Sequence, residues 1–254
     1  VRPANELTVA AIEVLANLDQ SESIPTFVDA TKSANVQLRQ AAWDILGNCE
    51  SADAAAAIAD GVQRYIAGSL SSDVHLNVLE AAEAKLDADL RQQLDEHQKS
   101  LKQSNPLASW MAALDGGDID AGRKLFFERS QLSCVRCHKV GLSGGEVGPS
   151  LNNVAKDKDR KYLLESICLP DATIAKGFET VLLADDSGQV HTGIVQEETE
   201  QYIDLIQADG VRRRILADEI VARRKGKSAM PDDLVKQMTL RELRDLVAYL
   251  AYLD

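Results

Sequence analysis

Two cysteines and a histidine stand together in the segment Cys134-Val135-Arg136-Cys137-His138. Two thiols at this spacing can reach both vinyl groups of one porphyrin, and the next residue then lies under the iron, where an imidazole can be an axial ligand. With four cysteines and four histidines in 254 residues, chance produces such a triplet in about one chain in a thousand. The segment therefore predicts one covalently attached haem c, bound through Cys134 and Cys137, with His138 as an iron ligand.

Two rival interpretations of the paired cysteines are a redox-active Cys-x-x-Cys and a structural zinc site. A redox pair is typical of a βαβ unit, whereas this pair follows a helical pattern. Zinc requires a second pair of ligands, and the remaining cysteines, Cys49 and Cys168, are not spaced as one. We expect Cys49 and Cys168 to be buried small hydrophobic residues without a disulfide.

A second axial ligand is sought among three methionines. Met238 lies beside a helix start, and Met111 precedes the cysteine motif next to Trp110. Met230 comes just before Pro231, whose ring stiffens the loop that would present the thioether. A thioether is a soft iron ligand, so we expect Met230 to bind the iron. His191 is the competing candidate, but it lies in a strand-like stretch, where a histidine is more often a surface or packed residue.

The elements that position these residues are a helix, a group of strands and a final helix. Apolar spacing predicts a helix from about 118 to 133. Alternating apolar residues with turn signals between them predict an antiparallel meander of four short strands, at 178–183, 190–195, 202–206 and 211–216. Thr239 and Glu242 form a capping box that marks the start of the last helix.

The region from residue 1 to about 104 is rich in Ala and Leu and predicts successive helices. The segment 7–17 aligns with 38–48 at a spacing of 31 residues, and a weaker third copy runs from about 73 to 85. The pattern resembles HEAT repeats, whose helix pairs bury their apolar faces by stacking. A small helical bundle is the alternative. Pro106 and the polar residues before it predict a boundary after residue 104.

The region from about Trp110 to Leu253 resembles the bacterial PVC-type c-type cytochrome domain. Besides the cysteine motif, the stretches that carry this resemblance are Gly116–Phe126, Gly144–Leu151, Tyr162–Ile167, Ala175–Glu179, Ser228–Pro231 and Arg244–Leu250. Cys168 is a small departure from the family pattern. The expected fold is therefore mainly α, with a HEAT-like domain at 1–104 and a cytochrome domain at 105–254 that contains a β insertion at about 178–217.

The resemblance to cytochromes c also implies particular contacts. Gly122 is expected to let the first helix of the domain approach the last one closely, with Phe126 packing near Leu246 and Tyr249. Pro149 is expected beside the haem, where its carbonyl oxygen can accept a hydrogen bond from Nδ1 of His138. That bond would fix the tautomer and leave Nε2 for the iron.

Composition and family together suggest a redox module outside the cytoplasm. The formal net charge of -12 argues against nucleic-acid binding, and no apolar run reaches the roughly 20 residues of a membrane span. Haem attachment to such motifs takes place outside the cytoplasm, so we expect a periplasmic or similar location. The start at Val1 indicates a processed form or an excised piece. The expected partner is a redox protein or a fused sugar-dehydrogenase-like domain, by analogy with the family.

Two other functions remain open at this point. A haem enzyme or gas sensor would have a labile sixth ligand, and an interaction scaffold would rely on the helical repeats with a structural haem. A further hypothesis concerns the basic residues that precede Met230 in an otherwise acidic chain. They either pair with haem propionates, steer an acidic redox partner or form a solvated surface. These residues are Arg212, Arg213, Arg214, Arg223, Arg224, Lys225 and Lys227.

Overall fold

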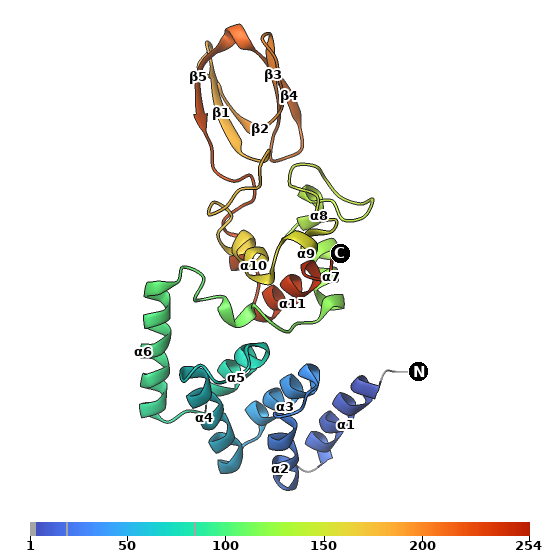
Figure 1. Cartoon of the computed structure of the whole chain (residues 1–254), viewed down its shortest axis with the longest axis vertical. Helices are drawn as coiled ribbons and strands as arrows, with labels where there is room; N and C mark the ends of the chain where they lie inside the picture. The colour runs from blue at the N-terminus through green and yellow to red at the C-terminus, as the bar shows by residue number, and fades with distance from the viewer. Residues whose placement is uncertain (1–3, 19, 84) are drawn as a thin grey trace. The chain divides into compact units, whose positions relative to one another are not determined.

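The computed structural model describes residues 4–18, 20–83 and 85–254, and it divides into two compact units, one ending at Gly117 and one from Asp118 to Asp254 (Figure 1). Helices make up most of its secondary structure, in agreement with the expected mainly α fold. Within the described ranges, no helix combines the length and apolar character needed to cross a bilayer.

The first unit consists of helices in succession along the chain. Its elements are α1 (Ala4–Leu18), α2 (Gln20–Ala30), α3 (Val36–Asn48), α4 (Ala52–Ile66), η1 (Ser72–Val74), α5 (His75–Ala82), α6 (Ala88–Ser104) and η2 (Met111–Ala113). Side-chain caps mark several helix starts: Asn35, Ser51 and Asp87 each accept a hydrogen bond from a backbone N–H of the first turn.

Alternate helices of the first unit contact one another, α1 with α3 and α3 with α5, and likewise α2 with α4 and α4 with α6. Both copies of the 31-residue alignment are helical, although the side chains of Leu7, Thr8 and Asn17 lie outside the described residues. One apolar cluster, which includes Phe27 and Trp43, extends through the helices. Contacts between alternate helices are what a stack of helix pairs requires.

The expected boundary after residue 104 marks the end of a helix but not the end of the first unit. Helix α6 ends at Ser104, yet the unit continues to Gly117. The short helix η2, which contains the buried Ala113, explains the difference because it packs against α5. The segment after Pro106 therefore belongs to the helical unit.

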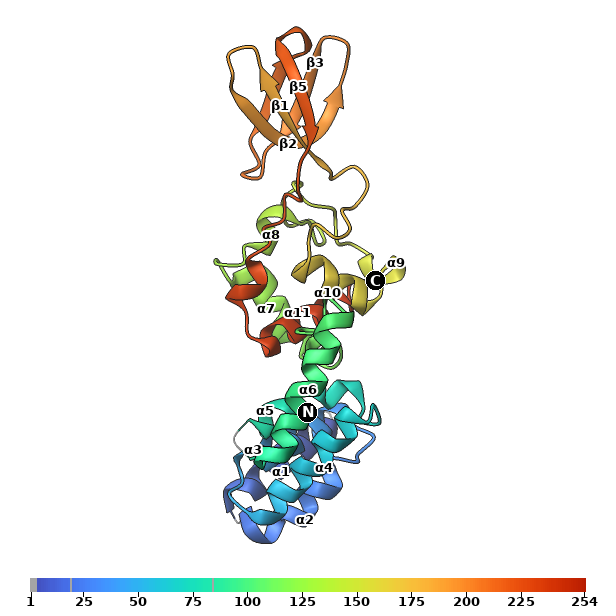
Figure 2. The same cartoon turned by 90° about the vertical axis from the view of Figure 1, so that its left-hand side faces the viewer.

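The second unit contains five α-helices and five strands among the described residues (Figure 2). The helical elements are α7 (Ile119–Glu128), α8 (Cys134–Cys137), α9 (Val154–Asp157), α10 (Arg160–Cys168), η4 (Leu234–Gln237) and α11 (Leu240–Leu250). The expected helix from 118 to 133 is wrong at its C-terminal end, because α7 ends at Glu128. Arg129 adopts an extended conformation, and a turn leads to Ser133, whose φ of 50° cannot continue a helix.

Helices α7 and α11 form the closest helix pair of this unit. Gly122 lies where the two backbones meet, since a Cβ at this position would be 2.0 Å from the carbonyl oxygen of Asp245. Phe126 is buried beside Tyr249, with ring centroids 5.8 Å apart. The expected capping box is present at the start of α11, where Thr239 and Glu242 exchange hydrogen bonds. The predicted close approach at Gly122 is confirmed.

The strands form one antiparallel sheet in the order β4-β3-β2-β1-β5. Their bounds are β1 (Thr180–Asp185), β2 (Val190–Glu198), β3 (Tyr202–Ile206), β4 (Arg212–Leu216) and β5 (Ile220–Lys225), with η3 (Ala217–Glu219) before β5. The four expected strands are present, but the expected end of the insertion at about 217 is wrong. Strand β5 was missed because it is an exposed edge strand that ends in three basic residues and lacks apolar alternation.

Substitution of Gly122 by Ala is expected to separate α7 from α11, because the new methyl group has no space between the two backbones. Overpacking of this kind lowers stability by about 1–3 kcal/mol. Hydrogen exchange of the α7 and α11 amides measures the effect, with Lys124→Ala at an exposed position of the same helix as the control. Equal protection of these amides in Gly122→Ala and in the unsubstituted protein would contradict the close approach.

Candidate functional site

The two motif cysteines lie on the single helical turn α8, the cysteine turn. Because residues three positions apart share one face of a helix, the thiols of Cys134 and Cys137 point to the same side. Ser133 enters the turn with a left-handed backbone conformation, and the backbone N–H of His138 closes it with a hydrogen bond of 2.9 Å to the carbonyl oxygen of Cys134. The turn thus places two thiols and one imidazole within five consecutive residues.

The glycine-rich loop, residues 144–149, folds back over this turn. The backbone N–H of Gly145 donates to the carbonyl oxygen of Val135 at 3.0 Å, and that of Gly148 donates to the carbonyl oxygen of Cys137 at 2.8 Å. A Cβ on Gly148 would lie 2.5 Å from Cε1 of His138. Only glycine therefore allows the loop to lie against the imidazole ring, a role that the sequence analysis did not assign to Gly148.

The loop ends at Pro149, which fixes the imidazole of His138. Nδ1 of His138 donates a hydrogen bond of 2.9 Å to the carbonyl oxygen of Pro149, so the expected contact is present. Burial lowers the pKa of His138, which favours the neutral ring with its proton on Nδ1. Nε2 then has its lone pair available for a metal ion.

The segment that carries Met230 and the cysteine turn both contact one apolar cluster. Ala229 and Cys137 pack against the same apolar cluster, although they are far apart in the sequence. The backbone N–H of Ser228 donates to the carboxylate of Asp171 at 2.7 Å, and that of Met230 donates to Oγ of Ser228 at 3.2 Å. The segment that carries Met230 is therefore anchored, and the side chain of Met230 is half-buried.

His191, the competing candidate, is held inside the sheet. Its side chain is buried in β2, with Nε2 at 2.8 Å from Asp185 and Nδ1 at 3.2 Å from Nη1 of Arg213. Hydrogen bonds from Ser187 and His191 lower the pKa of Asp185 to about 2. Since both ring nitrogens of His191 have partners in the sheet, this histidine is a packed structural residue.

Most of the basic residues before Met230 are paired with acidic neighbours. Arg214 makes two hydrogen bonds to Asp204, at 2.7 and 2.8 Å, and Arg223 makes one to Glu198 at 2.6 Å. Strands β4 and β5 are the two edges of the sheet, and charged side chains on edge strands discourage pairing with other chains. The charges of this group thus have a structural use in the sheet itself.

The surroundings of the motif thiols disfavour the thiolate form. Burial raises the pKa of Cys134 to about 11 and also raises the pKa of Cys137. A redox-active Cys-x-x-Cys has the opposite property, a lowered thiol pKa. Cys49 and Cys168 are free and buried, as expected. Among the described residues, no three His, Cys, Asp or Glu side chains lie close enough together to hold a metal ion.

The sequence did not predict the apolar cluster that contacts the cysteine motif. Val147 of the glycine-rich loop packs with Ile194 of β2 and Ile206 of β3, and all three side chains are buried. The cluster depends on the register of two strands, which the apolar alternation alone does not fix. The alternation in β2 and β3 indicated buried side chains, but not that they face the cysteine turn.

Alkylation of the haem-free protein tests the environment of the motif thiols. With a pKa of about 11, Cys134 has about one thiolate in a thousand molecules at pH 8, about a hundredfold less than a thiol of pKa 9. Because the pKa is raised, the rate at Cys134 should climb about tenfold per pH unit between pH 8 and 10. Mass spectrometry of iodoacetamide-treated protein reads the rate, and the exposed thiol introduced by Ser187→Cys is the control. Faster reaction at Cys134 than at this control would indicate a redox-active pair instead.

Residues 119–207 match the family model described as Cytochrome c. No curated protein matches the chain. The matched residues include α7, the cysteine turn, the glycine-rich loop and the first three strands. This match supports a c-type cytochrome domain in the second unit, and with it covalently bound haem c and haem-based electron transfer.

Proposed function

We propose that the chain is a monohaem c-type cytochrome module that transfers single electrons. The proposal rests above all on the imidazole of His138, which a hydrogen bond to Pro149 holds in the tautomer that leaves Nε2 for iron. The two thiols on the preceding turn provide the covalent attachment. The donor set of two thiols and one oriented imidazole fits a haem c. Gly148 supports this set, because only a residue without a side chain lets the loop lie against the imidazole.

In this proposal the haem supplies an iron that alternates between the ferrous and ferric states. Cys134 and Cys137 would form the thioether bonds that attach the haem, and His138 and Met230 would bind its iron. Pro149 keeps the proton on Nδ1 of His138, and a thioether ligand raises the potential relative to a second nitrogen ligand. Because His138 and Met230 would both bind the iron, no position at the metal would be left for a substrate.

We further propose that the second unit is of the PVC type and that the first unit is a HEAT-like repeat. The contacts between alternate helices support the repeat. The electron donor would be a fused or separate dehydrogenase, and the acceptor a downstream redox protein. Haem attachment to such a motif implies maturation outside the cytoplasm, so we propose a periplasmic or similar location.

The covalent attachment is tested by the pigment of the matured protein. The unsubstituted protein should stay coloured after denaturation and extraction with acidified solvent, because thioether bonds resist both treatments. The double variant Cys134→Ala, Cys137→Ala should lose all of the covalent haem, while Cys168→Ala, which removes a buried free thiol of the same unit, should retain it. A colourless matured protein, or a pigment that is fully extracted, would contradict the proposal.

The axial role of Met230 is tested by Met230→Ala, with Met238→Ala as the matched control. Loss of the thioether should remove the weak long-wavelength band of ferric iron and let carbon monoxide bind to the reduced protein. It should also lower the midpoint potential by about 60 mV or more, which is a tenfold change in the one-electron equilibrium. Ready binding of carbon monoxide by the unsubstituted protein would favour a haem enzyme or gas sensor with a labile sixth ligand.

A further inference from the structure

One row of four residues runs across the sheet from β1 to β4. The Cα partners along this row are Thr180 with Ile194, Ile194 with Ile206, and Ile206 with Arg212. Every member of the row contacts a segment of the candidate site, although the four residues come from four strands. Packing within the sheet alone does not explain why all four residues contact the candidate site.

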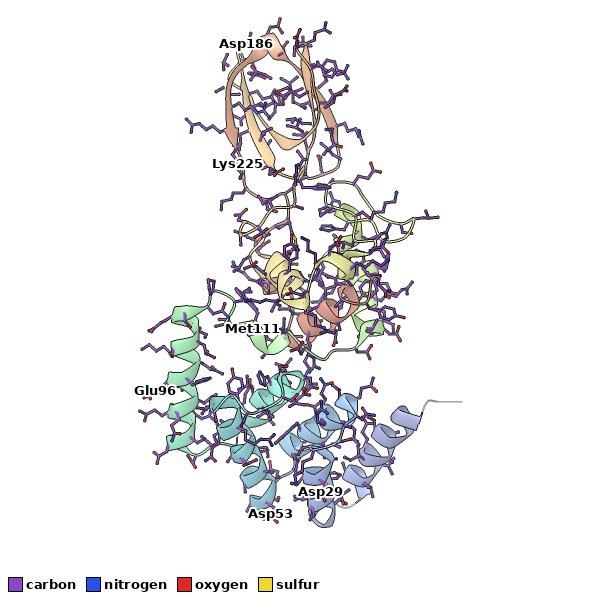
Figure 3. All side chains as sticks on the ribbon, in the orientation of Figure 1. Asp29, Asp53, Glu96, Met111, Asp186 and Lys225 are labelled. Atoms are coloured by element: carbon purple, nitrogen blue, oxygen red, sulfur yellow. The ribbon has the colours of Figure 1, made fainter. Side chains whose placement is uncertain are left out.

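The row lies at one end of the sheet. Val181, the neighbour of Thr180, pairs with Lys225 at the end of β5. Figure 3 labels Lys225 at this end and Asp186 at the opposite end, in the turn between β1 and β2. From Lys225 the chain continues directly to the segment of Met230, so the end of the sheet that carries the row is also the end from which that segment leaves.

The two central members of the row, Ile194 and Ile206, form an apolar contact with the site. They are 1% and 4% exposed, and with Val147 they make one buried cluster. Cys137 and Ala229 pack against this cluster. These two residues directly precede His138 and Met230, so the same apolar surface supports both segments that carry the proposed axial ligands.

The two outer members of the row attach the sheet to the same segments by polar contacts. The hydroxyl of Thr180 donates to the carbonyl oxygen of Lys227, and the backbone N–H of Gly226 donates to the carbonyl oxygen of Thr180 at 2.8 Å. Arg212 lies 3.4 Å from Glu146 of the glycine-rich loop, but both side chains are exposed. An exposed ion pair contributes little, so Ile194 and Ile206 make the main contact.

We propose that Ile194 and Ile206 are positioning residues that hold the segment of Met230 against the cysteine turn and exclude water from the Cys137 side of the haem. This inference rests on the proposed function. It also gives the β insertion a purpose, because the sheet then connects two ligand-bearing segments that are far apart in the sequence.

The covalent chemistry explains why these two side chains affect the haem. A thioether joins the sulfur of Cys137 to a carbon attached directly to the porphyrin ring, so groups packed on Cys137 lie beside that edge. An apolar environment disfavours the more highly charged ferric state and raises the potential. A looser contact at Ala229 would also weaken the positioning of the neighbouring Met230 side chain.

The test is Ile206→Thr, which keeps the β-branched shape and introduces a hydroxyl group, with Ile203→Thr as the matched control. Ile203 lies in the same strand and is also buried, but it packs in a separate cluster with Leu183, Leu205 and Ile215. In the haem-loaded protein, Ile206→Thr should weaken the long-wavelength ferric band. It should also shift the ferric to ferrous equilibrium about tenfold towards the ferric form, a fall of about 60 mV. Ile203→Thr should change neither.

The outcomes separate this inference from the proposed function. An unchanged band and potential in Ile206→Thr, or equal changes in both variants, would overturn the positioning role while the haem remains attached. If Ile206→Thr does not fold, Ile206→Val must show a smaller shift in the same direction, and its absence would overturn the role as well. A wild-type protein without covalent haem would overturn the proposed function and this inference together.

Discussion

The arrangement of the site depends on the hydrogen bond from Nδ1 of His138 to the carbonyl oxygen of Pro149. For this bond to form, the loop after the cysteine turn must fold back across the imidazole ring. That path is open only because Gly148 has no side chain, since a Cβ there would lie 2.5 Å from the ring. One backbone carbonyl therefore fixes the proton of His138 on Nδ1 and leaves the lone pair of Nε2 available.

Two other features of the second unit support this arrangement, a helix contact and an apolar cluster. The close contact of α7 and α11 at Gly122 holds the helix that precedes the cysteine turn. On the other side, the apolar cluster around Ile194 and Ile206 joins the turn to the segment of Met230. The sheet, which lies between the segments of His138 and Met230 in the sequence, thus contacts both of them.

Local sequence signals predicted much of the site, whereas features that depend on register were missed. The cysteine motif, the capping box at Thr239 and the glycine at the helix contact were visible because each is a short pattern with a single physical requirement. The cluster of Ile194 and Ile206 was not visible, since it requires the pairing of two strands. Strand β5 was missed because its exposed basic residues lack the alternation that marks a half-buried strand.

The central claim is that one haem is held between Nε2 of His138 and the sulfur of Met230. Proton NMR of the reduced protein tests it most directly, because the porphyrin ring current strongly shifts the methyl protons of an axial methionine. With methyl-labelled methionine, the account predicts one three-proton signal far upfield of the ordinary range, which disappears in a protein carrying Met230→Leu. A Met230 methyl signal at the ordinary position of a packed methionine would contradict the account.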